Sequence, residues 1–151
     1  MPKYSLPDSI DKLSPELLTM LVQERYPGAV VESFTILDSL NYGDGMVSTA
    51  ARATLNLHYR EGTGQSLATR VILKLAYDLA DLPWPLYANE VRFYKDLRPE
   101  LSLEIPETYG AAYDHDSHRF LLLIEDLTIK GAIFPNALRE NTLLELEKII
   151  S

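Results

Sequence analysis

Hydrophobic residues recur along the chain with two different periods, that of a helix and that of a strand. Ser14-Pro15-Glu16 is typical of a helix start, because Ser14 can cap the first turn and proline suits the first helical position. The apolar residues that follow at helical spacing, up to Pro27-Gly28 where we expect the helix to end, are Leu17, Leu18, Leu21 and Val22. Next, β-branched and aromatic residues predict a first strand over residues 30–37.

Residues 51–59, and again residues 70–75, alternate between the two sides of a strand, which is the pattern of strands with one buried face. Residues 51–59 and 67–76 are predicted strands, and the turn-rich connector 60–65 between them predicts an antiparallel hairpin. In the second strand, Val71, Leu73 and Leu75 share the apolar face. Arg70, Ile72 and Lys74 share the other face, so Lys74 projects from the middle of a strand among apolar neighbours.

The remaining segments predict two more strands and a final helix. Residues 108–113 and 119–124 read as strands around the polar turn 114–117, in which His115 and, just after it, His118 are expected to be surface residues. The continuous apolar run 120–124 indicates a strand buried on both faces, and it stops at Glu125-Asp126. Residues 141–150 have helical spacing. The predicted fold class is α+β, with an antiparallel five-stranded sheet, one packed helix and an N-terminal helix.

The stretch LYANEVRFYKDL, residues 86–97, predicts a helix with a carboxylate among its apolar positions. Two apolar rows recur at helical spacing, Leu86, Phe93 and Leu97 in one and Tyr87, Val91 and Tyr94 in the other. Glu90 lies between these rows, where an unpaired charge is disfavoured. A pair between Glu90 and Lys74 would satisfy both side chains. Such a pair can be a plain structural ion pair, and the two side chains can also reach solvent independently.

A glycine-containing turn precedes the hairpin. Gly43 and Gly45 flank Asp44, and Ser48 and Thr49 follow as the chain enters the next strand. Glycine permits a close approach of the backbone, and a turn of exposed N–H groups can hold phosphate. The same residues also form ordinary hairpin turns.

Composition narrows the classes of protein to be considered. The 151 residues are 46% hydrophobic and 24% charged, which is typical of one globular domain. A net charge of −8 and a pI near 4.8 argue against nucleic-acid binding. No apolar run approaches the roughly 20 residues of a membrane span, and the stretch MPKYSLPDSI is not expected to act as a secretory signal because it has no uninterrupted apolar core. The absence of cysteine fits a reducing compartment, and we expect a cytoplasmic protein.

The order of these parts resembles the N-terminal lobe of the aminoglycoside phosphotransferase-like kinases, in the branch with ecdysteroid kinase-like and choline kinase-like proteins. The segments that carry the resemblance, which extends from about Leu13 to the end, are GDGMVSTAARATL, VILKLA, YANEVRFYKDL, IPETYGAAYD and FLLLIEDL. It implies a protein-kinase-like small lobe, ATP and Mg²⁺ as cofactors, and transfer of phosphate to a hydroxyl of a small-molecule acceptor.

Site residues follow from the resemblance by position. Lys74 would bind ATP phosphates, and Glu90 would hold Lys74. Ile72 would line the adenine pocket, and the backbone of 125–127, at Glu125 and Leu127, would act as the hinge. The remaining cofactor-binding residues would be those of the phosphate loop: Gly43, Gly45, Ser48 and Thr49.

The resemblance also implies a C-terminal lobe that carries the catalytic loop and the metal ligands, and these motifs are absent from the chain. We therefore expect residues 1–127 to form the N-terminal lobe, with 1–28 as a helical extension, 29–124 as sheet plus helix and 125–127 as hinge. Residues 128–151 would begin a truncated second lobe, leaving the fragment inactive and prone to self-association through Leu143, Leu146 and Ile150. Two alternatives are a non-catalytic pseudokinase or regulatory nucleotide-binding module, and a helix-plus-sheet domain that binds an apolar ligand.

Overall fold

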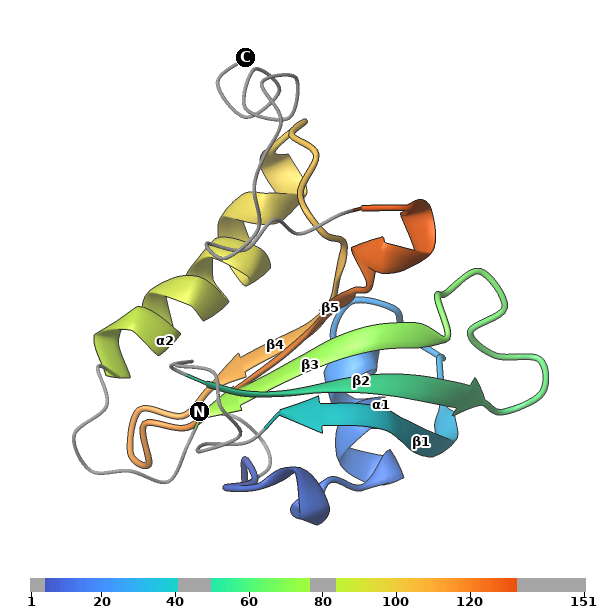
Figure 1. Ribbon diagram of the computed structural model, residues 1–151, viewed down its shortest axis with the longest axis horizontal. Coiled ribbons are helices and arrows are strands. Elements are labelled where there is room, and N and C mark those ends of the chain that lie inside the picture. The colour runs from blue at the N-terminus through green and yellow to red at the C-terminus, as the bar shows by residue number, and fades with distance from the viewer. Residues whose placement is uncertain (1–4, 41–49, 77–83, 133–151) are drawn as a thin grey trace, which may run out of the picture.

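The computed structural model describes residues 5–40, 50–76 and 84–132, and Figure 1 shows how their elements are arranged. The strands are β1 (Val31–Leu40), β2 (Ala50–Tyr59), β3 (Arg70–Ala76), β4 (Thr108–Tyr113) and β5 (Phe120–Glu125). The helices are α1 (Pro15–Gln23), α2 (Trp84–Arg92), the π-helix η2 (Phe93–Leu97), and the 3-10 helices η1 (Ile10–Lys12), η3 (Arg98–Glu100) and η4 (Leu127–Lys130).

The five strands form one antiparallel sheet in the order β1-β2-β3-β5-β4. β5 therefore lies between β3 and β4, which explains its continuous apolar sequence, because its side chains point into both layers beside the sheet. Phe120 and the three leucines that follow it are fully buried. The predicted α+β fold with a five-stranded antiparallel sheet is confirmed.

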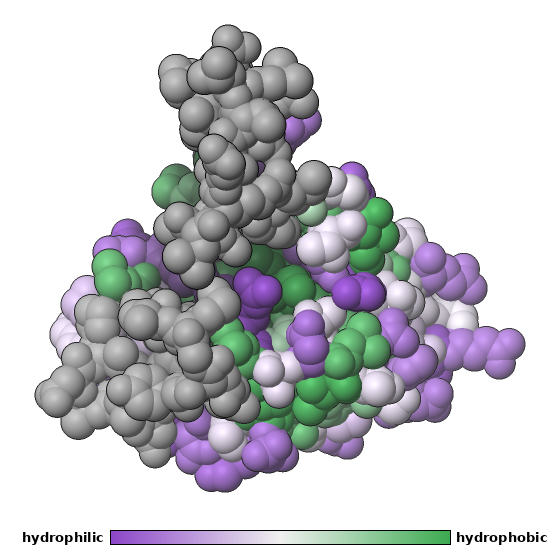
Figure 2. Space-filling model, in the orientation of Figure 1, coloured by the Kyte–Doolittle hydropathy of each residue, from purple (hydrophilic) through white to green (hydrophobic). Residues whose placement is uncertain are grey.

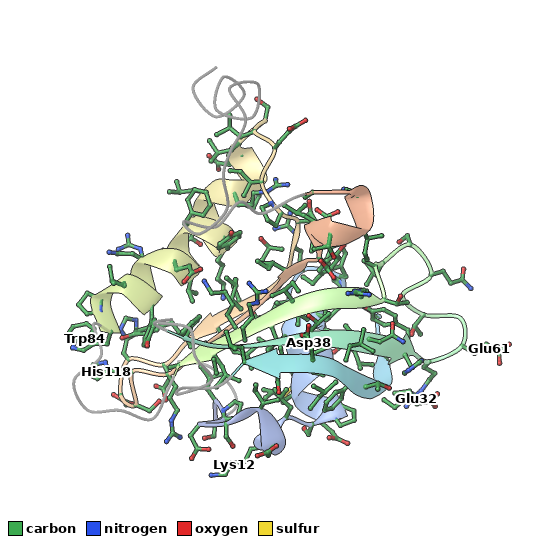
Figure 3. The ribbon with its side chains drawn as sticks, viewed as in Figure 1. Lys12, Glu32, Asp38, Glu61, Trp84 and His118 are labelled. Atoms are coloured by element: carbon green, nitrogen blue, oxygen red, sulfur yellow. The ribbon has the colours of Figure 1, made fainter. Side chains whose placement is uncertain are left out.

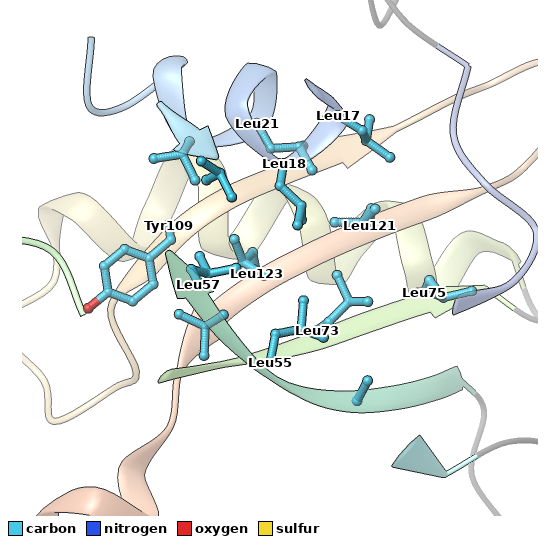
Figure 4. Close-up of a cluster of buried hydrophobic side chains, with 14 of the residues drawn as sticks. Leu17, Leu18, Leu21, Leu55, Leu57, Leu73, Leu75, Tyr109, Leu121 and Leu123 are labelled. Atoms are coloured by element: carbon cyan, nitrogen blue, oxygen red, sulfur yellow. The ribbon is translucent and has the colours of Figure 1, made fainter. Parts of the chain in front are cut away.

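α1 covers one face of the sheet (Figure 4). Its start follows the predicted chemistry, since Pro15 is the first residue and the Ser14 hydroxyl accepts a hydrogen bond from the Leu17 N–H at 3.2 Å. The helix packs four buried residues onto this face, namely Leu17, Leu18, Leu21 and Val22. The sheet residues that they meet come from β2, β3 and β5, among them Leu55, Leu57, Val71, Leu73, Leu121 and Leu123.

α2 covers part of the opposite face with a smaller cluster of buried residues: Ala50, Ala76, Tyr87, Val91, Ala111, Phe120 and Leu122. The Tyr87 ring stacks on Phe120 with centroids 4.5 Å apart, which anchors the first turns of the helix. Beyond Val91 the helix widens into η2, and Figure 1 shows this end of α2 standing away from the strands.

Several predicted boundaries and one predicted stripe are wrong. The segment 86–97 is not one α-helix, and Leu86 and Leu97 are 54% and 55% exposed, so the row that they share with Phe93 is not packed on the sheet. Only Tyr87 and Val91 of the second row are buried. They pack in a small cluster in which the sheet contributes several alanines, so two residues of the helix cover it.

Element ends differ by a few residues from the prediction. α1 stops at Gln23 rather than at the proline, and a turn with Gly28 at φ +91° follows it. β1 runs to Leu40 instead of ending at 37, and β3 begins at Arg70 instead of 67. β1 extends to Leu40 because β2 pairs with it along this whole length, and Leu40 lies opposite Arg52. The predicted loop residues Gly43, Gly45, Ser48 and Thr49, and the predicted helix 141–150, lie outside the described residues.

Candidate functional site

Lys74 and Glu90 form an ion pair between the sheet and α2. Alternation along β3 places Leu73 and Leu75 in the α1 face of the sheet, and so turns Lys74 toward α2. Glu90 lies on α2 one residue before the buried Val91, at the edge of the packed face. The side chains of Lys74 and Glu90 are 28% and 30% exposed, so the pair is partly shielded from water and accessible from one side.

A cleft of about 400 Å³ opens beside this pair, which is within the size range of small-molecule sites. β2, β3, β5, η2 and the segment after β5 all contribute to its wall. The lining residues are Ala50, Arg52, Ile72, Lys74, Tyr94, Pro106, Ile124, Glu125, Asp126, Leu127 and Thr128. Figure 2 looks onto this side of the molecule, where hydrophobic and hydrophilic residues lie side by side in the hollow between α2 and the sheet.

Strand register divides the floor of the cleft into an apolar row and a cationic row. In the first row, Ile72 of β3 lies opposite Ile124 of β5. In the second row, Lys74 lies opposite Arg52 of β2. The rows are two residues apart on the same face, or roughly 7 Å at the rise of an antiparallel strand. The cleft can therefore hold a ligand with a flat apolar part at one end and anionic groups at the other.

The segment that leaves β5 closes the apolar end, and its acids already have partners. Asp126 is buried, and its carboxylate accepts hydrogen bonds from the Arg70 Nε at 2.6 Å, the Thr128 N–H at 3.0 Å and the Thr128 hydroxyl at 2.6 Å. Burial by itself disfavours the charged form, but these bonds outweigh it and hold the pKa of Asp126 below its usual value.

Glu125 is held in a similar way at the end of β5. It pairs with Lys130 and accepts the Glu107 N–H at 3.2 Å. These contacts outweigh the effect of burial and lower the pKa of Glu125. Both carboxylates are therefore ionised at neutral pH and are bound to other groups of the protein. Their contacts hold in place the segment that forms this wall of the cleft, which includes Leu127.

The π-helix η2 forms the third side of the cleft through Tyr94. Its wider turn leaves the Tyr94 carbonyl to accept the hydroxyl of the buried Thr108 at 3.2 Å. Burial, and then the nearby Glu90 carboxylate, raise the pKa of Tyr94, so its hydroxyl stays protonated. Tyr94 also borders a second cavity of about 290 Å³, between α1 and η2, and so separates the two spaces.

The structure brings five of the predicted site residues together. Ile72, Lys74, Glu125 and Leu127 line the cleft, and Glu90 supports Lys74 from α2. The glycine loop cannot be placed against them because it lies outside the described residues.

Sequence reasoning did not assign six other residues that line the cleft: Ala50, Arg52, Tyr94, Pro106, Ile124 and Thr128. Arg52 carries a usable signal, since the alternation of its strand already puts it on the polar side.

Three further findings bear on the class of protein. Within residues 5–40, 50–76 and 84–132, no three His, Asp or Glu side chains are grouped so that they could hold a metal ion. No helix among the same residues has the length and apolar content needed to cross a membrane. Comparisons of the chain with protein-family models, with curated proteins and with solved structures found no match in any of the three.

Proposed function

We propose that this chain is the nucleotide-binding lobe of an ATP-dependent phosphotransferase that acts on a hydroxyl of a small molecule. The observation that carries the proposal is the Lys74–Glu90 ion pair at the cationic end of a cleft whose other end is apolar. A strand lysine held by a helix glutamate is the arrangement that kinases use to bind nucleotide phosphates.

The cleft supplies a different contact for each part of ATP. The adenine ring packs against Ile72 and Ile124, and its nitrogens hydrogen bond to the backbone between Glu125 and Leu127. The Lys74 ammonium then lies at the phosphates. Glu90 keeps the Lys74 ammonium directed into the cleft, because an unpaired lysine would turn toward water.

Phosphotransfer also needs groups that activate the acceptor and bind magnesium. The described residues offer contacts for the nucleotide but no set of ligands for Mg²⁺. Under this proposal the chain itself contributes binding and orientation of ATP, through Lys74 and the apolar row. Fixed charges around transferring phosphates are a main source of rate enhancement in such enzymes.

Calorimetric titration of ATP into the protein tests the binding step. Lys74→Met is expected to weaken ATP binding by roughly tenfold to a hundredfold, the value of one charge-assisted hydrogen bond. Lys95→Met is the matched control. Lys95 also pairs with a glutamate, Glu24, at 3.1 Å, but it does not line this cleft. Absence of ATP binding at millimolar concentration, or equal losses in both variants, would refute the proposal.

An assay of the whole gene product tests the transfer step. With Mg-ATP and a panel of alcohols, aminoglycosides and steroids, we expect turnover that Lys74→Met abolishes. Binding of ATP without any turnover would instead support a non-catalytic nucleotide-binding module. Binding of apolar ligands that is indifferent to Lys74→Met would support a lipid-type site.

A further inference from the structure

We propose that Arg52 is a second phosphate-binding group of the cleft, and that it selects ligands with two or more adjacent phosphates over those with one. This inference rests on the proposed function and adds a specificity-determining residue to it. Three observations support it, namely the position of Arg52 in the sheet, the pairing of the acids around it and the spacing of the cleft.

Arg52 and Lys74 form a cross-strand pair of like charges. The two residues lie directly opposite each other in the β2–β3 ladder, and both line the cleft. Like charges in this position destabilise a sheet, since their Cβ atoms are only about 5 Å apart. A shared anion between the two side chains converts this repulsion into two favourable contacts.

The acids that line the cleft or touch Lys74 are already engaged by other cations. Glu90 pairs with Lys74, Glu125 with Lys130, and Asp126 with Arg70. Among the described residues no ion pair or hydrogen bond involves the Arg52 side chain, which is exposed. Within residues 5–40, 50–76 and 84–132, the cationic row therefore has one positive charge without a paired acid, that of Arg52.

Asp38 is an acid on β1, the strand that pairs with β2 on the side away from β3. It lies opposite Thr54, and its carboxylate accepts the Thr54 N–H at 3.2 Å instead of pairing with the guanidinium. Asp38 lies near the C-terminal end of β1, and Figure 3 shows it away from α2. Among the described residues, neither Asp38 nor the acids of the cleft is thus paired with the Arg52 guanidinium.

The geometry of the cleft fits an extended anionic tail. A base over Ile72 and Ile124 places the first phosphates roughly 7 Å farther along, at the row of Lys74 and Arg52. One phosphate can be satisfied by the Lys74 point charge. A guanidinium binds phosphate oxygens in a bidentate manner, so Arg52 contributes most to the affinity when the ligand has a second phosphate.

The experiment compares adenosine, AMP, ADP, ATP and inorganic triphosphate as ligands, without divalent metal. The proteins are the wild type, Arg52→Gln, Arg52→Lys and the control Arg60→Gln, an exposed arginine just beyond the other end of β2. We expect Arg52→Gln to weaken ADP, ATP and triphosphate about tenfold or more, and AMP and adenosine less than twofold. Arg52→Lys should recover part of the loss, and Arg60→Gln should match the wild type.

Thermal melting separates this role from a structural one. Without ligand, Arg52→Gln should melt at the same temperature as the wild type or higher, because a repulsive pair has been removed. A lower melting temperature, or an equal loss of affinity for all ligands, would overturn the inference.

Inorganic triphosphate distinguishes failure of the inference from failure of the proposed function. Strong ATP binding that ignores Arg52→Gln refutes only the role of Arg52. Binding of triphosphate that depends on Arg52, without any preference for nucleotides, refutes the nucleotide site and supports the phosphate group. Binding of neither ligand refutes both.

Discussion

The two faces of the sheet differ in how completely they are covered. The α1 face is filled by leucines from the helix and from three strands, and nearly all of them are fully buried (Figure 4). The α2 face has a smaller cluster built largely of alanines and two aromatic rings, and charged residues adjoin it. The same strands supply both faces, because alternate residues point in opposite directions.

This difference assigns separate tasks to the two layers. Burial of apolar side chains on the α1 face supplies most of the stabilisation, at roughly 1.5 to 3 kcal/mol for each large side chain. The α2 face gives up part of that burial and leaves an open cleft with an ion pair on its wall. A site can be maintained on the second face because the first holds the sheet together.

Substitution of two adjacent residues tests this division most strongly. Leu73→Ala removes a fully buried side chain from the α1 face and should lower the free energy of unfolding by about 2 to 5 kcal/mol. Ile72→Ala, one residue earlier on the half-buried cleft face, should cost about 1 kcal/mol or less and weaken ligand binding instead. Urea unfolding of both variants measures this, and equal losses would refute the division.

Asp126→Asn should lower the free energy of unfolding by an amount that depends on pH. The pKa of Asp126 is lowered in the folded state, so its contribution is present above the unfolded value near 3.8 and is lost as pH falls through the folded pKa. At pH 7 the substitution should cost about 1 to 3 kcal/mol, the range for a disturbed buried polar group.

Melting curves from pH 7 to pH 3 measure this effect. The gap between wild type and Asp126→Asn should narrow below about pH 4, whereas the gap for Leu73→Ala should stay nearly constant. A gap for Asp126→Asn that is the same across this range would contradict the assigned ionisation.

Gly110→Ala tests how closely β4 approaches α1. A Cβ at this position would lie 2.9 Å from the Leu21 Cβ and 3.2 Å from two Leu21 backbone atoms, so the helix must shift. We expect a loss of about 1 to 3 kcal/mol by thermal unfolding, typical of overpacking. ATP affinity measured below the melting transition should be unchanged, since the shift affects the α1 face. A neutral effect on stability would show that α1 is less tightly fixed than this contact indicates.

Strong periodicity in the sequence was enough to predict most of the fold. Alternation correctly assigned the faces of β2 and β3, because successive side chains of a strand point to opposite faces of the sheet. The Ser14 cap and the buried run of β5 were predicted for equally local reasons. The Lys74–Glu90 pair was predicted because two charges in apolar surroundings need each other.

Features that depend on packing between distant segments could not be predicted. Leu86 looked like part of a buried stripe, yet the helix meets the sheet through Tyr87 and Val91 only. The change to a π-helix at Phe93 has no sequence signal of its own. Alternation puts Arg52 on the polar side of its strand, but its position opposite Lys74 follows from the register, which is set by the whole sheet.

A smaller effect is expected where α2 meets the β4–β5 turn. There Trp84 stacks on His118 with ring centroids 4.4 Å apart, as Figure 3 shows, and His118 has φ +55°. His118→Gly and His118→Ala both lose the stack, but only glycine relieves the left-handed backbone. The glycine variant should be about 1 kcal/mol more stable than the alanine variant by urea unfolding. Equal stability would show that this turn relaxes without the histidine.

Glu90→Gln tests the central claim most directly, because it keeps the shape of the side chain and removes only the charge that holds Lys74. ATP affinity by calorimetry and unfolding by urea should be measured on the same preparation. We predict a fall in ATP affinity of about tenfold with a loss of stability below about 1 kcal/mol, since the pair is partly exposed. A lower stability with unchanged ATP affinity would contradict the account and make the pair purely structural.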